Sequence, residues 1–132
     1  MMSAKRGERA VRGRAAHSVL VVEDDPGIGG ILESLFESEG YRVRWALRAR
    51  EALRLAGSER PDLMTLDLNL PDLSGEEVLQ HLAQDDELAR IPVVVLSAYT
   101  ARVRPTPQVV RVMSKPFDLD DLLATTEAAL TS

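Results

Sequence analysis

The sequence lacks cysteine, so disulfide bridges and thiolate metal sites are excluded. It also lacks any apolar run close to the roughly 20 residues that a membrane-spanning helix requires. Residues 1–17 contain no apolar stretch of the kind found in secretory signals. These absences predict a cytoplasmic protein without membrane contact. At 132 residues the chain is long enough for one domain with a single hydrophobic core.

Lysine is almost missing as well. The chain has fourteen Arg but only two Lys, Lys5 near the start and Lys115 near the end. Lys offers a compact, flexible charge where Arg offers a planar fork, so the Lys115 retained in the body invites a chemical explanation. A chance surface lysine is the alternative.

Positive charge is concentrated in the first segment, although the whole chain carries a formal net charge of −5. Residues 1–17 hold a run of basic side chains against a single Glu8: Lys5, Arg6, Arg9, Arg12 and Arg14. Their small polar context predicts a disordered basic arm, and contact of the arm with an acidic surface stays open. The remaining body, residues 18–132, is acidic, which argues against direct binding of DNA.

Short apolar segments indicate β-strands at residues 19–22, 41–46, 63–66, 91–96 and 109–113. Amphipathic segments indicate helices at residues 26–39, 49–56, 75–83 and 119–130. Asp25 and Pro26 are suited to start the first helix, while Gly40 and Gly57 are suited to end the first and second. Apolar strands alternating with helices predict a doubly wound five-stranded parallel sheet of flavodoxin-like order 2-1-3-4-5.

The segment 100–108 is the least regular part of this pattern. Pro105 and Pro107 each remove a backbone donor and oppose a helix. We therefore expect a loop or a broken helix there, which leaves the fourth helix of the fold shortened or irregular.

Polar residues follow four of the strands where the chain leaves the sheet: Glu23 and Asp24, Asp67, Ser97, and Lys115. The carboxyl ends of parallel strands meet at one edge, where ligands bind in open α/β folds. Three carboxylates brought together must shift their pKa values or share a cation, and Mg²⁺ accepts such oxygen ligands. Ser97 and Lys115 can contact phosphate oxygens, and a carboxylate can accept a phosphoryl group covalently.

Four motifs carry a resemblance to a known family. They are V-L-V-V-E-D-D-P, P-D-L-M-T-L-D-L-N-L-P-D-L-S-G, V-V-V-L-S-A and S-K-P-F, and the resemblance covers residues 18–132. The chain resembles the CheY-like receiver domains of two-component response regulators. This implies a phosphoprotein that takes a phosphoryl group from a sensor histidine kinase or a histidine phosphotransfer protein. It also implies that the domain signals to a separate downstream protein.

The resemblance implies a Mg²⁺ site and a phospho-acceptor. Asp67 matches the phospho-accepting aspartate, which also contacts the metal. Asp24 matches a direct Mg²⁺ ligand and Glu23 a ligand that acts through water. Asn69 matches the position whose backbone carbonyl completes the metal shell.

The resemblance gives further roles to the ends of the last two strands. Ser97 and Lys115 match the hydroxyl and the ammonium that contact the phosphoryl group. Pro116 matches a proline that often follows a cis peptide. Such a domain is a signalling module that catalyses its own phosphotransfer and dephosphorylation, not an enzyme for an external substrate.

The chain departs from the family at the position three residues before the lysine. Receivers usually carry Tyr or Phe there as an aromatic switch, whereas this chain has Val112. The segment between Ser97 and Lys115 is also a few residues short. We expect activation to proceed without the usual switch, with Tyr99 the nearest aromatic residue.

A different class of function remains as the alternative: a receiver-fold binding module that is never phosphorylated. The presence of all five cleft groups favours phosphorylation, because a pure scaffold needs none of them. The chain ends at Ser132, directly after its last helix, so we expect no attached output module. A terminal output and an intermediate in a phosphorelay are both open. His17 and His81 are expected to be surface residues.

Overall fold

The computed structural model describes residues 17–98, 103–104 and 106–131. The strands are β1 (Ser18–Val22), β2 (Arg42–Ala46), β3 (Leu63–Asp67), β4 (Val93–Ser97) and β5 (Val109–Ser114). The helices are α2 (Pro26–Ser38), α3 (Ala49–Glu59), α4 (Gly75–Ala83), the 3₁₀-helix η1 (Leu88–Arg90) and α5 (Leu119–Thr131). None of these helices in the described part of the chain is long and apolar enough to cross a bilayer.

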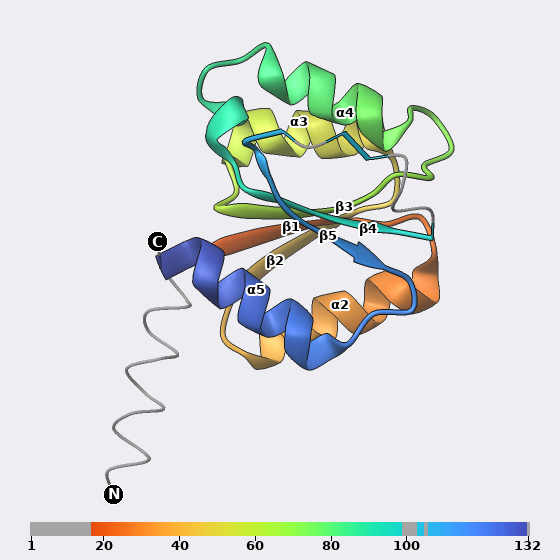
Figure 1. Cartoon of the computed structure of the whole chain (residues 1–132), viewed down its shortest axis with the longest axis vertical. Coiled ribbons are helices and arrows are strands. Elements are labelled where there is room, and N and C mark those ends of the chain that lie inside the picture. The colour runs from red at the N-terminus through yellow and green to blue at the C-terminus, as the bar shows by residue number, and fades with distance from the viewer. Residues whose placement is uncertain (1–16, 99–102, 105, 132) are drawn as a thin grey trace, which may run out of the picture.

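The strands form one parallel sheet in the order β2-β1-β3-β4-β5, which confirms the predicted flavodoxin-like topology. In Figure 1, α3 and α4 lie on one side of the sheet and α2 and α5 on the other. Strand order reverses between β1 and β3, so a crevice opens at their carboxyl ends, as doubly wound sheets require.

The core consists of two layers, one on each face of the sheet. Under α3 and α4 the buried side chains are aliphatic, and they include Leu20, Val22, Met64 and Leu66. Under α2 and α5 the buried set includes Val19, Val21, Leu63, Phe36 and Tyr41. Neighbouring residues of β1 and β3 therefore alternate between the layers, as the pleat of a strand dictates.

The first helix begins as the sequence predicts. Asp25 is the N-cap of α2, its side chain accepts hydrogen bonds from the N–H groups of Gly27 and Ile28, and Pro26 opens the helix. Gly40 follows the end of the helix with φ at 93°, a left-handed conformation that glycine adopts at little cost.

The predicted end of α3 at Gly57 is wrong, because the helix continues to Glu59. Its cap is Arg60, whose φ is 46° and whose N–H donates to the carbonyl of Ala56. A non-glycine residue therefore takes the left-handed position, a role that sequence patterns assign to glycine. Strand β4 also starts two residues later than predicted, since Ile91 closes η1 and Pro92 lacks an N–H.

The described residues between β4 and β5 belong to no helix. Thr106 accepts a backbone hydrogen bond from Val109 in a turn that leads into β5. The expectation of a loop is thus met at Val103, Arg104 and 106–108, whereas Tyr99 to Arg102 and Pro105 lie outside the described residues. The predicted basic arm, residues 1–17, lies outside them except for His17.

Candidate functional site

Strand parity places the chemistry of the site on one face of the sheet. Val21 and Leu63 face the layer under α2 and α5. Glu23 lies two residues after Val21 and Asp67 four residues after Leu63, so both have the same parity as that layer. Met113 of β5 faces the same layer, so Lys115 follows with the same parity. Three charged groups from the ends of β1, β3 and β5 therefore converge beside the crevice.

Asp67 is the last residue of β3, and only 5% of it is exposed. Its Oδ1 accepts a hydrogen bond of 3.0 Å from the backbone N–H of Asn69, the second residue of the following loop. Its Oδ2 lies 3.4 Å from the Nζ of Lys115. A carboxylate held in this way has a fixed orientation toward the cleft, with the ammonium of Lys115 beside it.

Glu23 is the most deeply buried charged group of the site, with 1% of its surface exposed. Its Oε1 accepts a hydrogen bond of 2.8 Å from Lys115 Nζ, and its Oε2 accepts one of 3.2 Å from the N–H of Asp25. Burial raises the pKa of Glu23 from 4.5 to about 7, although the Lys115 hydrogen bond opposes the rise and nearby Asp67 adds to it.

Lys115 is shared by the two buried carboxylates. Burial alone would lower the pKa of Lys115, but the hydrogen bond to Glu23 and the charge of Asp67 outweigh it and hold the pKa above its usual value. The peptide between Lys115 and Pro116 is cis, as the resemblance implies, and the Lys115 N–H donates to the Ser97 carbonyl. The scarce lysine of the sequence is therefore a structural and electrostatic part of the site.

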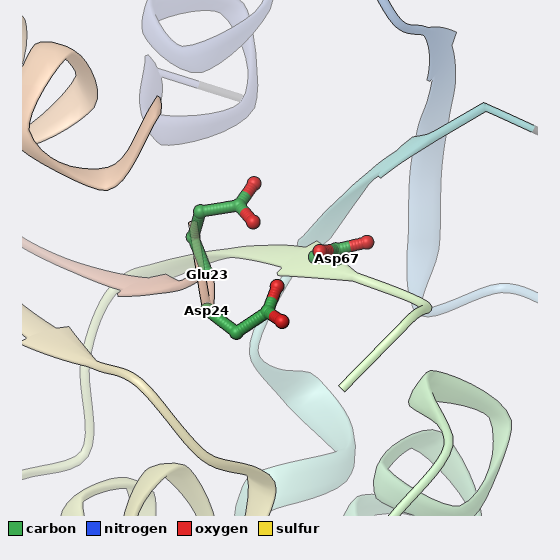
Figure 2. Close-up of side chains that lie close together, drawn as sticks. All are labelled: Glu23, Asp24 and Asp67. Atoms are coloured by element: carbon green, nitrogen blue, oxygen red, sulfur yellow. The ribbon is translucent and has the colours of Figure 1, made fainter. Parts of the chain in front are cut away.

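Asp24 completes an acidic cluster and is exposed to solvent. Figure 2 shows that its carboxylate and that of Glu23 leave the end of β1 on the side where Asp67 lies. One oxygen from each of Glu23, Asp24 and Asp67 lies within 4.8 Å of the others. One ammonium against three carboxylates leaves an all-oxygen donor set with excess negative charge, which fits a hard divalent cation such as Mg²⁺.

The predicted site residues all line one cleft of about 450 Å³. Its walls are Glu23, Asp24, Asp25, Pro26, Ile28, Asp67, Asn69, Ser97, Ala98 and Lys115. Val112 is half-buried and packs against the core layer under α3 and α4. It therefore lies on the opposite face of the sheet from Lys115. His81 is exposed, as expected.

Trp45 supports the site in a way that the sequence pattern did not indicate. Its indole N–H donates a 2.9 Å hydrogen bond to the backbone carbonyl of Glu23. Its ring lies against the backbone of Gly29, where an added Cβ would come within 2.6 Å of the indole nitrogen. Gly29, which weakens α2 by propensity alone, thus makes room for the ring that anchors the end of β1.

Fold and cleft together define a class: a flavodoxin-like α/β domain with an acidic, lysine-bridged cleft at its switch point. The family described as the response regulator receiver domain matches residues 19–127. The chain belongs to this family, and the resemblance drawn from the four sequence motifs is confirmed.

Two similar proteins align with this chain over most of their own length. The polar-differentiation response regulator DivK of Brucella anthropi is 40% identical over 85 residues, 64% of this chain and 69% of that protein. The sporulation initiation phosphotransferase F of Bacillus subtilis is 32% identical over 108 residues, 79% of this chain and 86% of that protein.

A solved structure gives a close match in three dimensions. The receiver domain of a sensor histidine kinase from Pseudomonas aeruginosa PAO1 has a TM-score of 0.79 and 25% identity, covering 88% of this chain and 98% of that chain. That domain holds a magnesium ion in its active-site cleft. The chain described here is therefore a two-component receiver domain.

Proposed function

We propose that this chain is a cytoplasmic phospho-acceptor of two-component signalling, in which Asp67 receives a phosphoryl group from a phosphohistidine. The observation that carries the proposal is the position of Lys115, whose ammonium contacts both Glu23 and Asp67 at the buried end of the cleft. A surface lysine would have no reason to be held between two buried carboxylates.

In the proposed transfer, a carboxylate oxygen of Asp67 attacks the phosphorus of the donor. An oxygen–phosphorus bond forms as the phosphorus–nitrogen bond breaks, and the donor imidazole leaves with the bond's electron pair and takes up a proton. The Asn69 N–H orients the carboxylate through Oδ1, so the nucleophile is fixed before the donor arrives. Lys115 and the Ser97 hydroxyl line the cleft where the phosphoryl oxygens would lie.

The residues suited to hold Mg²⁺ are Asp24 and Asp67 directly, Glu23 through water, and the backbone carbonyl of Asn69. When bound, the ion supplies charge neutralisation for a phosphoryl group entering an acidic cleft. The chain's own contribution is to hold Glu23 and Asp67 apart from bulk water with a single ammonium between them. Hydrolysis of the acyl phosphate by water then returns Asp67 to a carboxylate.

The partners in this proposal are a sensor histidine kinase or histidine phosphotransfer protein as donor, and a separate downstream protein as target. Direct DNA binding is not part of it. Val112 has no ring to move when the phosphoryl group arrives, so we propose that the signal passes through the loops after Asp67 and Ser97. The similarity to the sporulation initiation phosphotransferase F supports a role as a phosphorelay intermediate. A terminal output stays equally open.

The deciding experiment measures phosphoryl uptake from phosphoramidate or acetyl phosphate with millimolar Mg²⁺, read as a mass increase of the intact protein. We expect the parent to gain one phosphoryl group and Asp67→Asn to gain none. Asp62→Asn is the matched control, because Asp62 precedes the same strand and accepts a hydrogen bond from the Ser18 N–H at the opposite edge. Labelling that persists in Asp67→Asn would refute the acceptor assignment.

The second candidate is a binding module with a receiver fold and no phosphorylation. It would be favoured by a parent protein that folds, stays unlabelled with every small phosphodonor and with a phosphohistidine protein, and loses no function on Asp67→Asn. The shared Lys115 argues against it, because a scaffold gains nothing from burying Glu23 and Asp67 together.

A further inference from the structure

Helix α3 begins without a cap from its own sequence. Its N-cap residue is Arg48, which has the extended backbone of a cap, φ −137° and ψ 153°, but makes no side-chain cap hydrogen bond. The N–H groups of Ala49 and Arg50 instead donate to Asp72, at 2.8 Å to Oδ1 and 2.9 Å to Oδ2. A carboxylate 22 or more positions along the chain therefore does the work of a cap.

Asp72 lies in the loop between β3 and α4, five positions after Asp67 in the sequence. A carboxylate at a helix N-terminus is favoured by the unpaired N–H groups and by the helix dipole. Although burial raises the pKa of Asp72, the hydrogen bonds from Arg50 and Ala49 outweigh it and bring the pKa below its usual value. Asp72 therefore acts as an anion that connects the loop after Asp67 to the N-terminus of α3.

The rest of this loop is fixed at its two ends. At the start of the loop the Asn69 N–H donates to Asp67. At its end the Ser74 side chain caps α4. The Gly75 N–H donates to the Leu68 carbonyl at 3.0 Å, and a Cβ on Gly75 would come within 2.6 Å of the Leu68 Cα, so the two ends of the loop lie tightly together. In the middle of the loop, Asp72 makes the polar contact with α3, and the leucine side chains on either side of it pack on the core.

We propose that Asp72 is a positioning residue for the acceptor cleft: by capping α3 from the loop, it holds Asn69 where the cleft needs it. The proposal rests on the proposed phospho-acceptor function and adds a residue to it. The start of α3 and the loop then move together, so a change in the loop on phosphorylation also displaces the start of α3. Asp72 is not among the residues that line the cleft, and in this proposal it acts through Asn69.

The test uses Asp72→Ala with Asp85→Ala as a matched control. Asp85 also accepts two backbone hydrogen bonds, from the N–H groups of Glu87 and Leu88, but it follows α4 at the opposite edge of the sheet. We expect both variants to lower the urea midpoint by similar amounts. Only Asp72→Ala should weaken Mg²⁺ binding, which calorimetry measures. We expect a loss of affinity of about 10-fold, the lower end of what is typical when a residue that orients a metal ligand is removed.

A second variant separates helix stability from loop position. Arg48→Asp combined with Asp72→Ala gives α3 a cap from its own sequence, because Arg48 already has cap geometry. We expect this double variant to regain the parent's urea midpoint, while its Mg²⁺ affinity stays low and the Asn69 amide exchanges faster than in the parent. Recovery of both stability and affinity would overturn the positioning role, since a structural cap alone would then explain Asp72.

The two proposals fail in different ways. A parent that binds no Mg²⁺ and takes up no phosphoryl group refutes the phospho-acceptor function. A parent that does both, matched by Asp72→Ala in affinity and uptake rate, refutes the role of Asp72 and leaves the acceptor function intact.

Discussion

Two adjacent glycines of α2 should respond in opposite ways to the same substitution. Gly29 and Gly30 are both inside the helix, so alanine at either position should gain about 1 kcal/mol of helix propensity. At Gly30 a new Cβ meets nothing within 4 Å. At Gly29 it meets the ring of Trp45, with the indole nitrogen 2.6 Å away and two ring carbons closer still.

The expected change in the free energy of unfolding combines the cost of crowding Trp45 with the loss of its hydrogen bond. Overpacking a well-packed site costs about 1–3 kcal/mol. Loss of the hydrogen bond from the Trp45 indole to the Glu23 carbonyl costs about 1 kcal/mol more. Set against the propensity gain, Gly29→Ala should be destabilised by about 2 kcal/mol, while Gly30→Ala should be stabilised by about 1 kcal/mol. We therefore expect the two variants to differ by about 3 kcal/mol.

Urea unfolding followed by far-ultraviolet circular dichroism measures this difference. Trp45 is the only tryptophan of the chain, so its emission reports separately whether the ring has moved. In Gly29→Ala the emission should shift toward that of a solvated indole, and in Gly30→Ala it should match the parent. Equal stabilisation by both substitutions, with unchanged emission, would refute the packing argument.

Two further predictions concern the cleft and the chain terminus. Because the folded-state pKa of Glu23 is raised from 4.5 to about 7, the folded protein binds more protons than the unfolded chain between these values. This contribution to stability is fully present below about pH 4.5 and is lost as the pH rises through about 7. Mg²⁺ should therefore raise the thermal midpoint more at about pH 8 than at about pH 6, and Glu23→Gln should flatten the metal-free stability profile. Equal Mg²⁺ effects at both pH values in the parent would contradict this. A chain that starts at His17 should keep the parent's urea midpoint and phosphoryl uptake, because residues 1–16 offer little apolar surface to bury; a large loss of stability would show that the segment packs on the domain.

The convergence of the site was predictable because it follows from two periodicities. Parallel strands align their carboxyl ends, and side chains alternate along each strand, so Glu23, Asp67 and Lys115 reach the same place without any knowledge of the loops. The start of α2 was predictable because Asp25 and Pro26 are local signals. The family followed from short motifs whose order is specific, and the residues that it singles out line one cleft.

The features that sequence reasoning missed are contacts between distant segments. Asp72 caps a helix that starts 23 positions earlier, and the sequence around Arg48 gives no sign of it. Trp45 reads as an ordinary core residue until its ring is found over Gly29. The end of α3 was misplaced because Gly57 is a local stop signal that the packing of Leu55 and Ala56 overrides. Each miss has the same cause: tertiary contact outweighs a local preference.

The two core layers differ in a way that affects how this protein can be watched. The described aromatic rings, Phe36, Tyr41, Trp45 and Phe117, all belong to the layer under α2 and α5. The described side chains under α3 and α4, where the loop carrying Asp72 packs, are aliphatic. Among the described residues, fluorescence and near-ultraviolet signals therefore come from the layer under α2 and α5, and the described core side chains of the other layer contribute none. Methyl resonances fill that second layer, which makes nuclear magnetic resonance of Leu, Val, Ile and Met groups the method able to see it respond.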